Sequence, residues 1–227
     1  MLKKILLWSL LAIVTFVAVL FINLKVYLKK ANIVSHGTPI REYSSDKAAL
    51  LVIDIQEVTT GEMSASESFK NASDDLIKRI NTITEKSSKN GIAVIFIRNE
   101  VTNPLVNLLN NTMAKGSPGA QLDSRLNLVS DYVLGKEKKD AFSNPGLDSI
   151  LIKREINKLF VVGLDAAHCV NSTIEGARNR GYKVAAIGDA IISDPDTVKS
   201  SMLKRYAGIG VEILNTEKFF MELDDGI

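Results

Sequence analysis

The sequence predicts an α/β protein: a three-layer sandwich with a mainly parallel, Rossmann-like sheet, preceded by one N-terminal transmembrane helix. Three observations lead to this expectation. A long apolar stretch lies within the first thirty residues. From residue 48 onward, short continuous apolar runs alternate with amphipathic stretches. Strand, helix and strand at this spacing require crossover connections, which place parallel strands in one sheet with helices on both faces.

The N-terminal stretch has the length of a membrane span. Residues 5–24 form a run of 20 residues without a charge, and a helix of that length is about 30 Å long, like the hydrocarbon core of a bilayer. A buried core helix and a cleaved signal peptide are the alternatives. Core helices are rarely so uniformly apolar, and the apolar region of a signal peptide has only about 7–15 residues. Because the run also ends in the basic segment KVYLKK, we expect residues 1–30 to be an uncleaved, single-pass anchor in the cell membrane.

The charges that flank this run leave its orientation open. Lys3 and Lys4 precede the run and three lysines follow it, so the positive-inside rule does not decide which side of the membrane holds the domain. The polar, aperiodic residues 31–47 are expected to form a linker, and residues 48–227 the folded domain.

Composition excludes several classes of protein. The first thirty residues carry five lysines and no acid, and the remainder has 23 basic and 26 acidic residues, a net charge of −3. A slightly acidic body does not provide the basic surface that nucleic acids require. One cysteine excludes an intrachain disulfide, and two histidines exclude a multi-histidine metal site. No GxGxxG, GxxxxGK[ST] or GxSxG motif is present, which disfavours nucleotide binding and serine hydrolysis.

Within the domain, each apolar run predicts a strand and each amphipathic stretch a helix. The expected strands are residues 48–54, 92–99, 132–134, 158–164, 182–189 and 211–214. The first expected helix has an apolar face through residues 69–83 and ends near Asn90. A second helix begins at Asn144-Pro145. The others run from Cys169 to about Arg180, from about Asp196 to Tyr206, and over a short C-terminal stretch. The asparagine-rich residues 100–131 are expected to be loop.

Several chemically active side chains fall at or just after the ends of these strands. Parallel sheets bind ligands outside the carboxyl ends of their strands, which directs attention to Asp54, Arg98, Lys136, the 164–169 turn and Asp189. A cysteine at the start of a helix, such as Cys169, is a candidate nucleophile because the helix N-terminus lowers the pKa of a thiol.

Each of these residues also has a structural interpretation. A free cysteine is often a small buried hydrophobe, Asp54 could cap a turn, and the lysines of GKEKKDAF could form a solvated face. His168 adjoins Cys169 in the sequence, but neighbours at a helix start point in different directions. We therefore interpret His168 as a residue of the pocket wall rather than as a base.

Three motifs together resemble the isochorismatase-like cysteine hydrolase superfamily, which includes nicotinamidases and carbamoylsarcosine-type amidohydrolases. They are LLVIDIQ, KxxxDAF and VVGLDAAHCVNSTIEGARNRGYKVAAIGDAI, and the likeness covers residues 48–222. The resemblance implies a catalytic triad, which falls on Asp54, Lys136 and Cys169 by motif match. Lys136 is chosen over its neighbours because the family lysine stands six positions before the aromatic residue, here Phe142.

The same resemblance implies further site features. The oxyanion would be held by the backbone N–H groups of Asp165 and Cys169, and the Leu164–Asp165 peptide would be cis. Gln56 and Phe142 would contact the substrate, and specificity would depend on the loops at residues 55–68 and 99–131.

Two differences from the family patterns restrict the cofactor and the reaction that we expect. Nicotinamidases of the superfamily bind a metal through an aspartate and several histidines after the second strand, but residues 99–131 contain no histidine. We therefore expect no metal and no other cofactor. True isochorismatases cleave a vinyl ether and can lack the cysteine, so that Cys169 favours C–N or acyl chemistry.

The resulting hypothesis is a membrane-tethered cysteine hydrolase that cleaves an amide, ureido or carbamoyl bond of a small molecule through a thioester. A homo-oligomer is possible because proteins of this family commonly pair. The alternative is a non-catalytic binding or scaffold module of the same fold. A pocket too closed for a ligand, or a Lys136 side chain that points to solvent, would favour that alternative.

Overall fold

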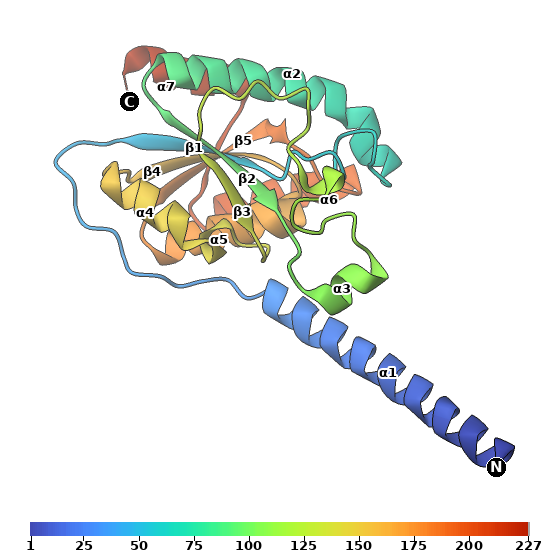
Figure 1. Ribbon diagram of the computed structural model, residues 1–227. Coiled ribbons are helices and arrows are strands. Elements are labelled where there is room, and N and C mark those ends of the chain that lie inside the picture. Colours follow the sequence, from blue (N-terminus) through green and yellow to red (C-terminus); the bar gives the residue numbers. More distant parts are fainter. Residues whose placement is uncertain (227) are drawn as a thin grey trace.

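The computed structural model of the protein describes residues 1–226 and confirms an α/β fold with a parallel sheet (Figure 1). All strand pairs are parallel, and the strand order is β3-β2-β1-β4-β5-β6. The strands are β1 (Ala48–Ile53), β2 (Ala93–Asn99), β3 (Val133–Lys136), β4 (Lys158–Gly163), β5 (Lys183–Ile191) and β6 (Glu212–Leu214). The helices are α1 (Leu2–Ala31), α2 (Glu67–Lys89), α3 (Pro104–Leu109), α4 (Pro145–Lys153), α5 (Asn171–Asn179), α6 (Asp196–Gly208) and α7 (Thr216–Asp225).

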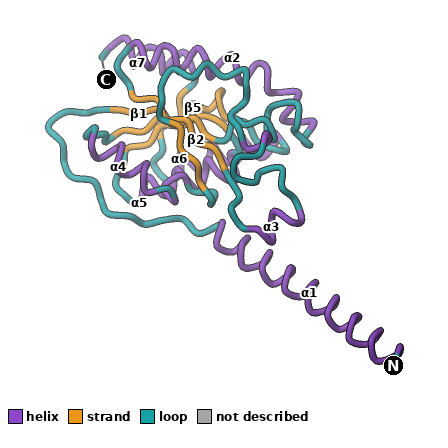
Figure 2. The backbone as a smooth tube through the Cα atoms, in the orientation of Figure 1, coloured by secondary structure: helices purple, strands orange, loops and turns teal. Residues whose placement is uncertain are grey.

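Helices cover both faces of the sheet, which makes three layers. Figures 1 and 2 show α2 and α7 on one face and α4, α5 and α6 on the other. Each face has its own core: the α2 and α7 side contains Leu76, Ile80 and Phe219, whereas the opposite side contains Leu151 and Ile174. Because both faces of the strands are covered, β1 is buried at every residue, which explains its continuous apolar sequence.

Residues 100–131, expected to be loop with little regular structure, contain one short helix and one 3₁₀ turn. These are α3 and η1, at Pro118–Ala120. The Asn103 side chain accepts hydrogen bonds from the N–H groups of Leu105 and Val106, and Pro104 occupies the first turn. This is the same start signal as Asn144-Pro145. The sequence signal was therefore present, but the helix is only one and a half turns long.

Two strands are longer than expected, and both extensions bear on the site. β3 continues to Lys136, two residues beyond the apolar segment that predicted it, because Asn99 pairs with Lys136 in the register of β2 and β3. β5 continues to Ile191, where it pairs with Gly163 after a register shift in β4.

The N-terminal helix α1 stands apart from the domain, and none of its residues is buried (Figure 1). Its length and apolar composition are sufficient to cross a membrane. Residues 32–47, expected to be a linker, have no regular structure but are bonded to the domain. The Ser35 N–H donates to Asp140 Oδ2 at 2.8 Å, and the Ile40 N–H donates to the Arg180 carbonyl at 2.8 Å.

Gly163 marks a point where two strand backbones approach closely at the edge of the sheet that carries the site. Its φ is 116°, and a Cβ at this position would lie 2.1 Å from the Ile53 carbonyl oxygen. Only glycine fits this combination of backbone angle and space.

We expect Gly163→Ala to lower the free energy of unfolding by at least about 2 kcal/mol, because both the left-handed φ and the clash oppose a methyl group. Chemical denaturation of the full chain measures this change. Gly208→Ala is the matched control, since its Cβ would meet no atom within 4 Å and alanine favours a helix by up to about 1 kcal/mol. Equal stability of the two variants would contradict the prediction.

Candidate active site

Asp54, Lys136 and Cys169 meet at the carboxyl edge of the sheet. The Lys136 Nζ lies 2.8 Å from Asp54 Oδ2 and 3.3 Å from Cys169 Sγ. The side chain of Lys136 is fully buried and that of Asp54 is 6% exposed, whereas Cys169 is partly exposed. Residues that lie 33 to 115 positions apart in the chain therefore form one cluster. Its lysine points inward, which removes one of the two observations that would have favoured a non-catalytic module.

The strand register explains how these side chains meet. Ile53, the last residue of β1, pairs with Gly163, the last residue of β4, so these two strands end at the same level. Ile53 also pairs with Ile97 of β2, which continues two residues further to Asn99, the partner of Lys136 in β3. Asp54 follows directly with a left-handed φ of 56°, a conformation that aspartate tolerates better than most residues. Its N–H donates to the Ile97 carbonyl, and its own carbonyl accepts a hydrogen bond from Thr59 Oγ1. These bonds fix the turn on which the carboxylate is carried.

Cys169 lies in a wide π-helical turn, η3 (Ala166–Val170), that precedes α5. α5 thus begins two residues after the expected start at Cys169, and the π-helical turn before it begins three residues earlier than that start. The Asp165 carboxylate holds the turn: it accepts hydrogen bonds from the N–H of Ala167, from Ser193 Oγ and from the N–H of Asp194. On the other side, the Tyr206 hydroxyl donates to the Ala166 carbonyl.

The environment of the thiol corrects the expected direction of its pKa shift. Burial, and next the negative charge of Asp54, raise the pKa of Cys169 to about 12, although the Lys136 ammonium opposes them. Cys169 is the fourth residue of the helical segment that begins at Ala166, so burial and the Asp54 charge raise the pKa of its thiol despite a position in the first turn of that segment. The resting thiol is thus protonated at neutral pH.

The charges of Lys136 and Asp54 balance each other, which is compatible with a neutral thiol on Cys169. Burial alone would lower the pKa of Lys136, but the charges of Asp54 and Cys169 together raise it above its usual value. The lysine is therefore an ammonium ion paired with the Asp54 carboxylate. Asp54 Oδ2 accepts from Lys136, whereas buried Oδ1 has no hydrogen-bond partner within residues 1–226. This second oxygen is free to accept a proton from the thiol.

The Leu164–Asp165 peptide is cis, as the resemblance implied. In the described part of the chain, the Asp165 N–H makes no hydrogen bond, so it is available to an oxyanion. The assignment of the oxyanion to the N–H groups of Asp165 and Cys169 stays a prediction.

The expected substrate contacts, Gln56 and Phe142, have structural tasks in this fold. Gln56 is fully buried, and its amide bonds the backbone of Asn99 and the carbonyl of Ala120, joining the end of β2 to the 112–120 loop. Phe142 is 3% exposed and packs against Tyr182 and the Arg180 guanidinium. Neither side chain offers an open face, so their contacts with a substrate stay predictions.

Other residues named from strand ends lie outside the cluster. Asp189 pairs with Arg79 of α2, and Arg98 bonds Gln121 and Glu100. His168 is exposed, and its Nδ1 lies 3.3 Å from Lys139 Nζ at the rim of the site. A position after a strand end therefore does not by itself place a side chain in the cluster.

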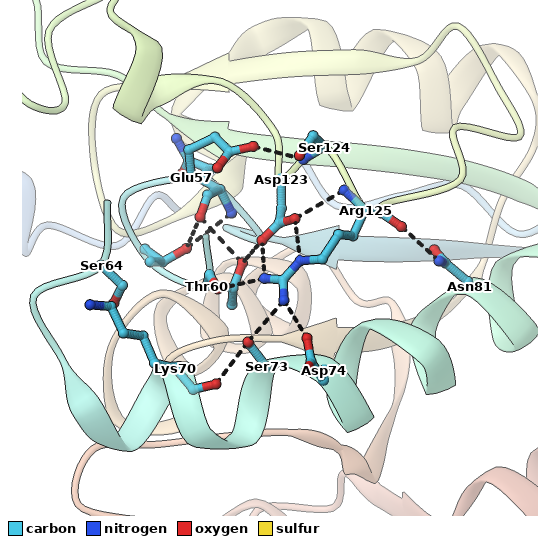
Figure 3. A network of polar contacts seen from close by, with 12 residues as sticks. Glu57, Thr60, Ser64, Lys70, Ser73, Asp74, Asn81, Asp123, Ser124 and Arg125 are labelled. Atoms are coloured by element: carbon cyan, nitrogen blue, oxygen red, sulfur yellow. Dashed lines mark hydrogen bonds and ion pairs between the residues drawn. The ribbon is translucent and has the colours of Figure 1, made fainter. Parts of the chain in front are cut away.

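A polar network that sequence reasoning missed secures the loops around the site (Figure 3). The Arg125 guanidinium bonds the Asp123 carboxylate, the Thr60 carbonyl and Asp74 of α2, and Thr60 Oγ1 donates to Asp123. Burial alone would raise the pKa of Asp123, but the hydrogen bonds from Arg125 and Thr60 lower it below its usual value. The network connects the 55–68 loop to the 121–127 segment. The only sequence signal for it was an acidic residue, Asp123, placed two positions before a basic one, Arg125.

The residues present do not fit a metal site of the nicotinamidase kind. Within residues 1–226, no group of three or more histidine, cysteine, aspartate or glutamate side chains is arranged to hold an ion. We therefore derive no chemical step through a metal.

Comparisons with known proteins identify relatives of the domain. A sequence model of the isochorismatase domain matches residues 48–218. None of the curated proteins matches the chain significantly by sequence.

Solved structures share the fold. A cysteine hydrolase from Pseudomonas syringae pv. phaseolicola 1448A superposes with a TM-score of 0.71 and 22% identity, over 84% of this chain and 100% of that chain. An N-carbamoylsarcosine amidase from Thermoplasma acidophilum has a TM-score of 0.62 and 24% identity, over 75% of this chain and 96% of its own. A nicotinamidase from Bacillus subtilis has a TM-score of 0.64 and 23% identity, over 74% of this chain and 99% of its own.

The electrostatics of the cluster predict how the thiol reacts with iodoacetamide. Because Cys169 is the one cysteine of the chain, alkylation of the full protein reports on it alone. With a thiol pKa near 12, alkylation at pH 7 should be slower than that of free cysteine, and its rate should rise with pH as the thiolate fraction increases.

Asp54→Asn removes the negative charge beside the thiol and leaves the Lys136 ammonium, so we expect the pKa of Cys169 to fall. Alkylation at pH 7 should then be at least about tenfold faster than in the unaltered protein, since one pKa unit is a factor of ten in thiolate. Circular dichroism controls for folding. An unaltered protein that is alkylated faster than free cysteine, or a variant that is slower still, would refute this electrostatic account.

Proposed function

The chain belongs to the isochorismatase family, and on this basis we propose that it is a membrane-tethered cysteine hydrolase. Its substrate would be a small amide, ureido or carbamoyl compound, and its reaction the cleavage of a C–N bond through a thioester. The observation that carries the proposal is the single lysine ammonium that contacts both the Asp54 carboxylate and the Cys169 sulfur. Two structural neighbours are an N-carbamoylsarcosine amidase and a nicotinamidase, which supports C–N chemistry on this fold.

The first half of the reaction forms the thioester. Asp54 takes the proton from the Cys169 thiol through its free Oδ1 as the sulfur attacks the carbonyl carbon. The carbonyl oxygen becomes an oxyanion, for which the Asp165 N–H is positioned as a donor. When the intermediate collapses, the C–N bond breaks and Asp54 passes its proton to the departing nitrogen.

The second half returns the enzyme to its starting state. The Asp54 carboxylate accepts a proton from water as the water oxygen attacks the thioester carbon. Collapse of this intermediate breaks the C–S bond, releases the carboxylic acid and gives the proton back to the sulfur. No group outside the three side chains and a water molecule is required.

Lys136 has a supporting role in each step. Its ammonium contacts the sulfur at 3.3 Å, so it stabilises the thiolate that forms during attack, when the negative charge moves from Asp54 to the sulfur. Because it is buried and paired, it also provides the counter-charge to the Asp54 carboxylate at the start of the cycle.

The N-terminal helix supports the tether. α1 is long and apolar enough to span a bilayer, and it ends in basic residues Lys29 and Lys30. These features fit a retained anchor better than a cleaved signal, because the apolar run exceeds the usual signal length. Self-association of the domain stays a prediction.

Substitution of the cluster tests the enzymatic proposal. We expect Cys169→Ala, Asp54→Asn and Lys136→Met each to reduce kcat for ammonia release by at least about a thousandfold, because nucleophile, base and stabilising charge act as one unit. A panel of primary amides, ureido and carbamoyl compounds supplies the substrate, and ammonia release is the readout. Lys153→Ala, an exposed lysine of α4, is the matched control and should retain activity. Turnover by Cys169→Ala at the unaltered rate would overturn the mechanism.

Extraction of membranes tests the tether separately. An intact anchor keeps the full-length chain in the membrane pellet after washing with alkaline carbonate, because hydrocarbon insertion resists both salt and pH. Mass spectrometry of the N-terminus should find residues 1–31 still attached. Release of a shortened chain into the supernatant would show a cleaved signal and would contradict the tether, without affecting the hydrolase proposal.

A further inference from the structure

We propose that α3 is a second membrane contact, whose exposed leucines enter the interface of the bilayer that α1 crosses. This inference rests on the proposed tether. The apolar surface of α3 would bind lipid of that same bilayer. This binding segment lies outside the catalytic cluster.

The position of α3 is the first argument. Figures 1 and 2 both show α3 beside the end of α1 nearest the domain. The two helices border a cleft of about 370 Å³ lined by Asn23, Val26 and Tyr27 of α1 and by Asn103 and Pro104 at the start of α3, among others. The uncharged run of α1 ends at residue 24, and Tyr27 lies only about 4.5 Å further along the helix axis. A span centred on the uncharged run therefore places α3 at the level of the lipid headgroups.

The side chains of α3 suit that level. Leu108 is 63% exposed and Leu109 is 54% exposed, although they are adjacent apolar residues on the outer side of the domain. Isolated exposed leucines need no explanation, but these two lie next to a helix that is itself apolar and unburied. Leucine side chains at the headgroup boundary bury apolar area in the acyl region, as in other interfacial helices.

The charges around α3 favour lipid over a protein partner. Residues 101–122 contain no acidic side chain and one basic one, Lys115. The adjoining end of α1 contributes Lys25, Lys29 and Lys30. Carboxylates are repelled by anionic headgroups, whereas lysines are attracted to them. Within residues 1–226, the one carboxylate that lines the cleft between the two helices, Glu137, is accompanied there by Lys30 and Lys138. The segment is therefore electrostatically compatible with a membrane surface.

This contact would also determine how the edge of the domain that carries Cys169 is oriented relative to the bilayer. The Lys139 N–H donates to the Ala31 carbonyl at the end of α1, and Lys139 Nζ contacts His168, the residue before Cys169. The end of the membrane helix and the rim of the site thus lie on one edge of the domain. With α3 seated in the interface, that edge faces the bilayer, so the substrate class that reaches it most readily is an amphiphile with an amide, ureido or carbamoyl group near the headgroup level.

Tryptophan fluorescence in lipid vesicles tests the contact. The chain has a single tryptophan, Trp8 in α1, so that Trp8→Phe gives a background in which one introduced tryptophan is observed. Leu108→Trp probes α3, and Leu109→Trp is a second probe should the first variant fold poorly. Leu128→Trp is the matched control, because Leu128 is as exposed as Leu109 at 54% but lies in the segment that leads into the amino end of β3.

The full-length variants are placed in vesicles of phosphatidylcholine and phosphatidylglycerol with bromine near the carbonyl end of the acyl chains. We expect the tryptophan at position 108 to be quenched at least about threefold more than that at position 128. Equal quenching at positions 108, 109 and 128 would overturn the inference. Protection of position 108 from a water-soluble quencher without quenching by bromolipid would indicate a protein partner, and would overturn it as well.

The unaltered protein separates this inference from the tether on which it rests. Trp8 lies inside the uncharged run and should be quenched by the same lipids if α1 spans the bilayer. Absence of Trp8 quenching would refute the tether and the α3 contact together. Quenching of Trp8 with equal quenching of positions 108 and 128 would refute the α3 contact alone.

Discussion

The ion pair between Lys136 and Asp54 is the constraint on which the arrangement of the site depends. Both charges are buried, and a buried charge without its partner is costly by several kcal/mol. The fold must therefore bring the ends of β1 and β3 together although β2 lies between them in the sheet. It does so because the parallel strands end within two residues of one another at one edge of the sheet, and it then places the sulfur within reach of the same ammonium.

Much of this architecture could be predicted because buried parallel strands leave a clear signal. β1 and β4 are continuous apolar runs, and the residues that follow them, Asp54 and the turn to Cys169, are the first polar groups at the sheet edge. Lys136 was harder, because its segment contains three lysines and only the motif spacing singled it out. The register of β3 against β2 explains the choice, since Lys136 is the last residue of the ladder and turns inward.

What could not be predicted depends on long-range contacts. The pKa of Cys169 is set by burial and by the Asp54 charge, neither of which is visible in the local sequence, so an argument from the helix start gave the opposite direction. The Arg125 network joins two loops and a helix through hydrogen bonds between residues up to 65 positions apart. Gln56 and Phe142 were likewise assigned as substrate contacts because they lie in the family motifs. Both are buried in the fold, and their burial depends on tertiary packing that the motifs do not reveal.

The bond between Ser35 and Asp140 limits how the domain can orient. It lies four residues after the end of α1 and four residues after Lys136, so the anchor and the catalytic loop share one rigid junction. For a tethered chain, this link restricts the tilt of the domain relative to the membrane surface. Two copies in one membrane that pair by two-fold symmetry must do so about an axis perpendicular to the bilayer, because a two-fold axis in the membrane plane would invert one of the anchors.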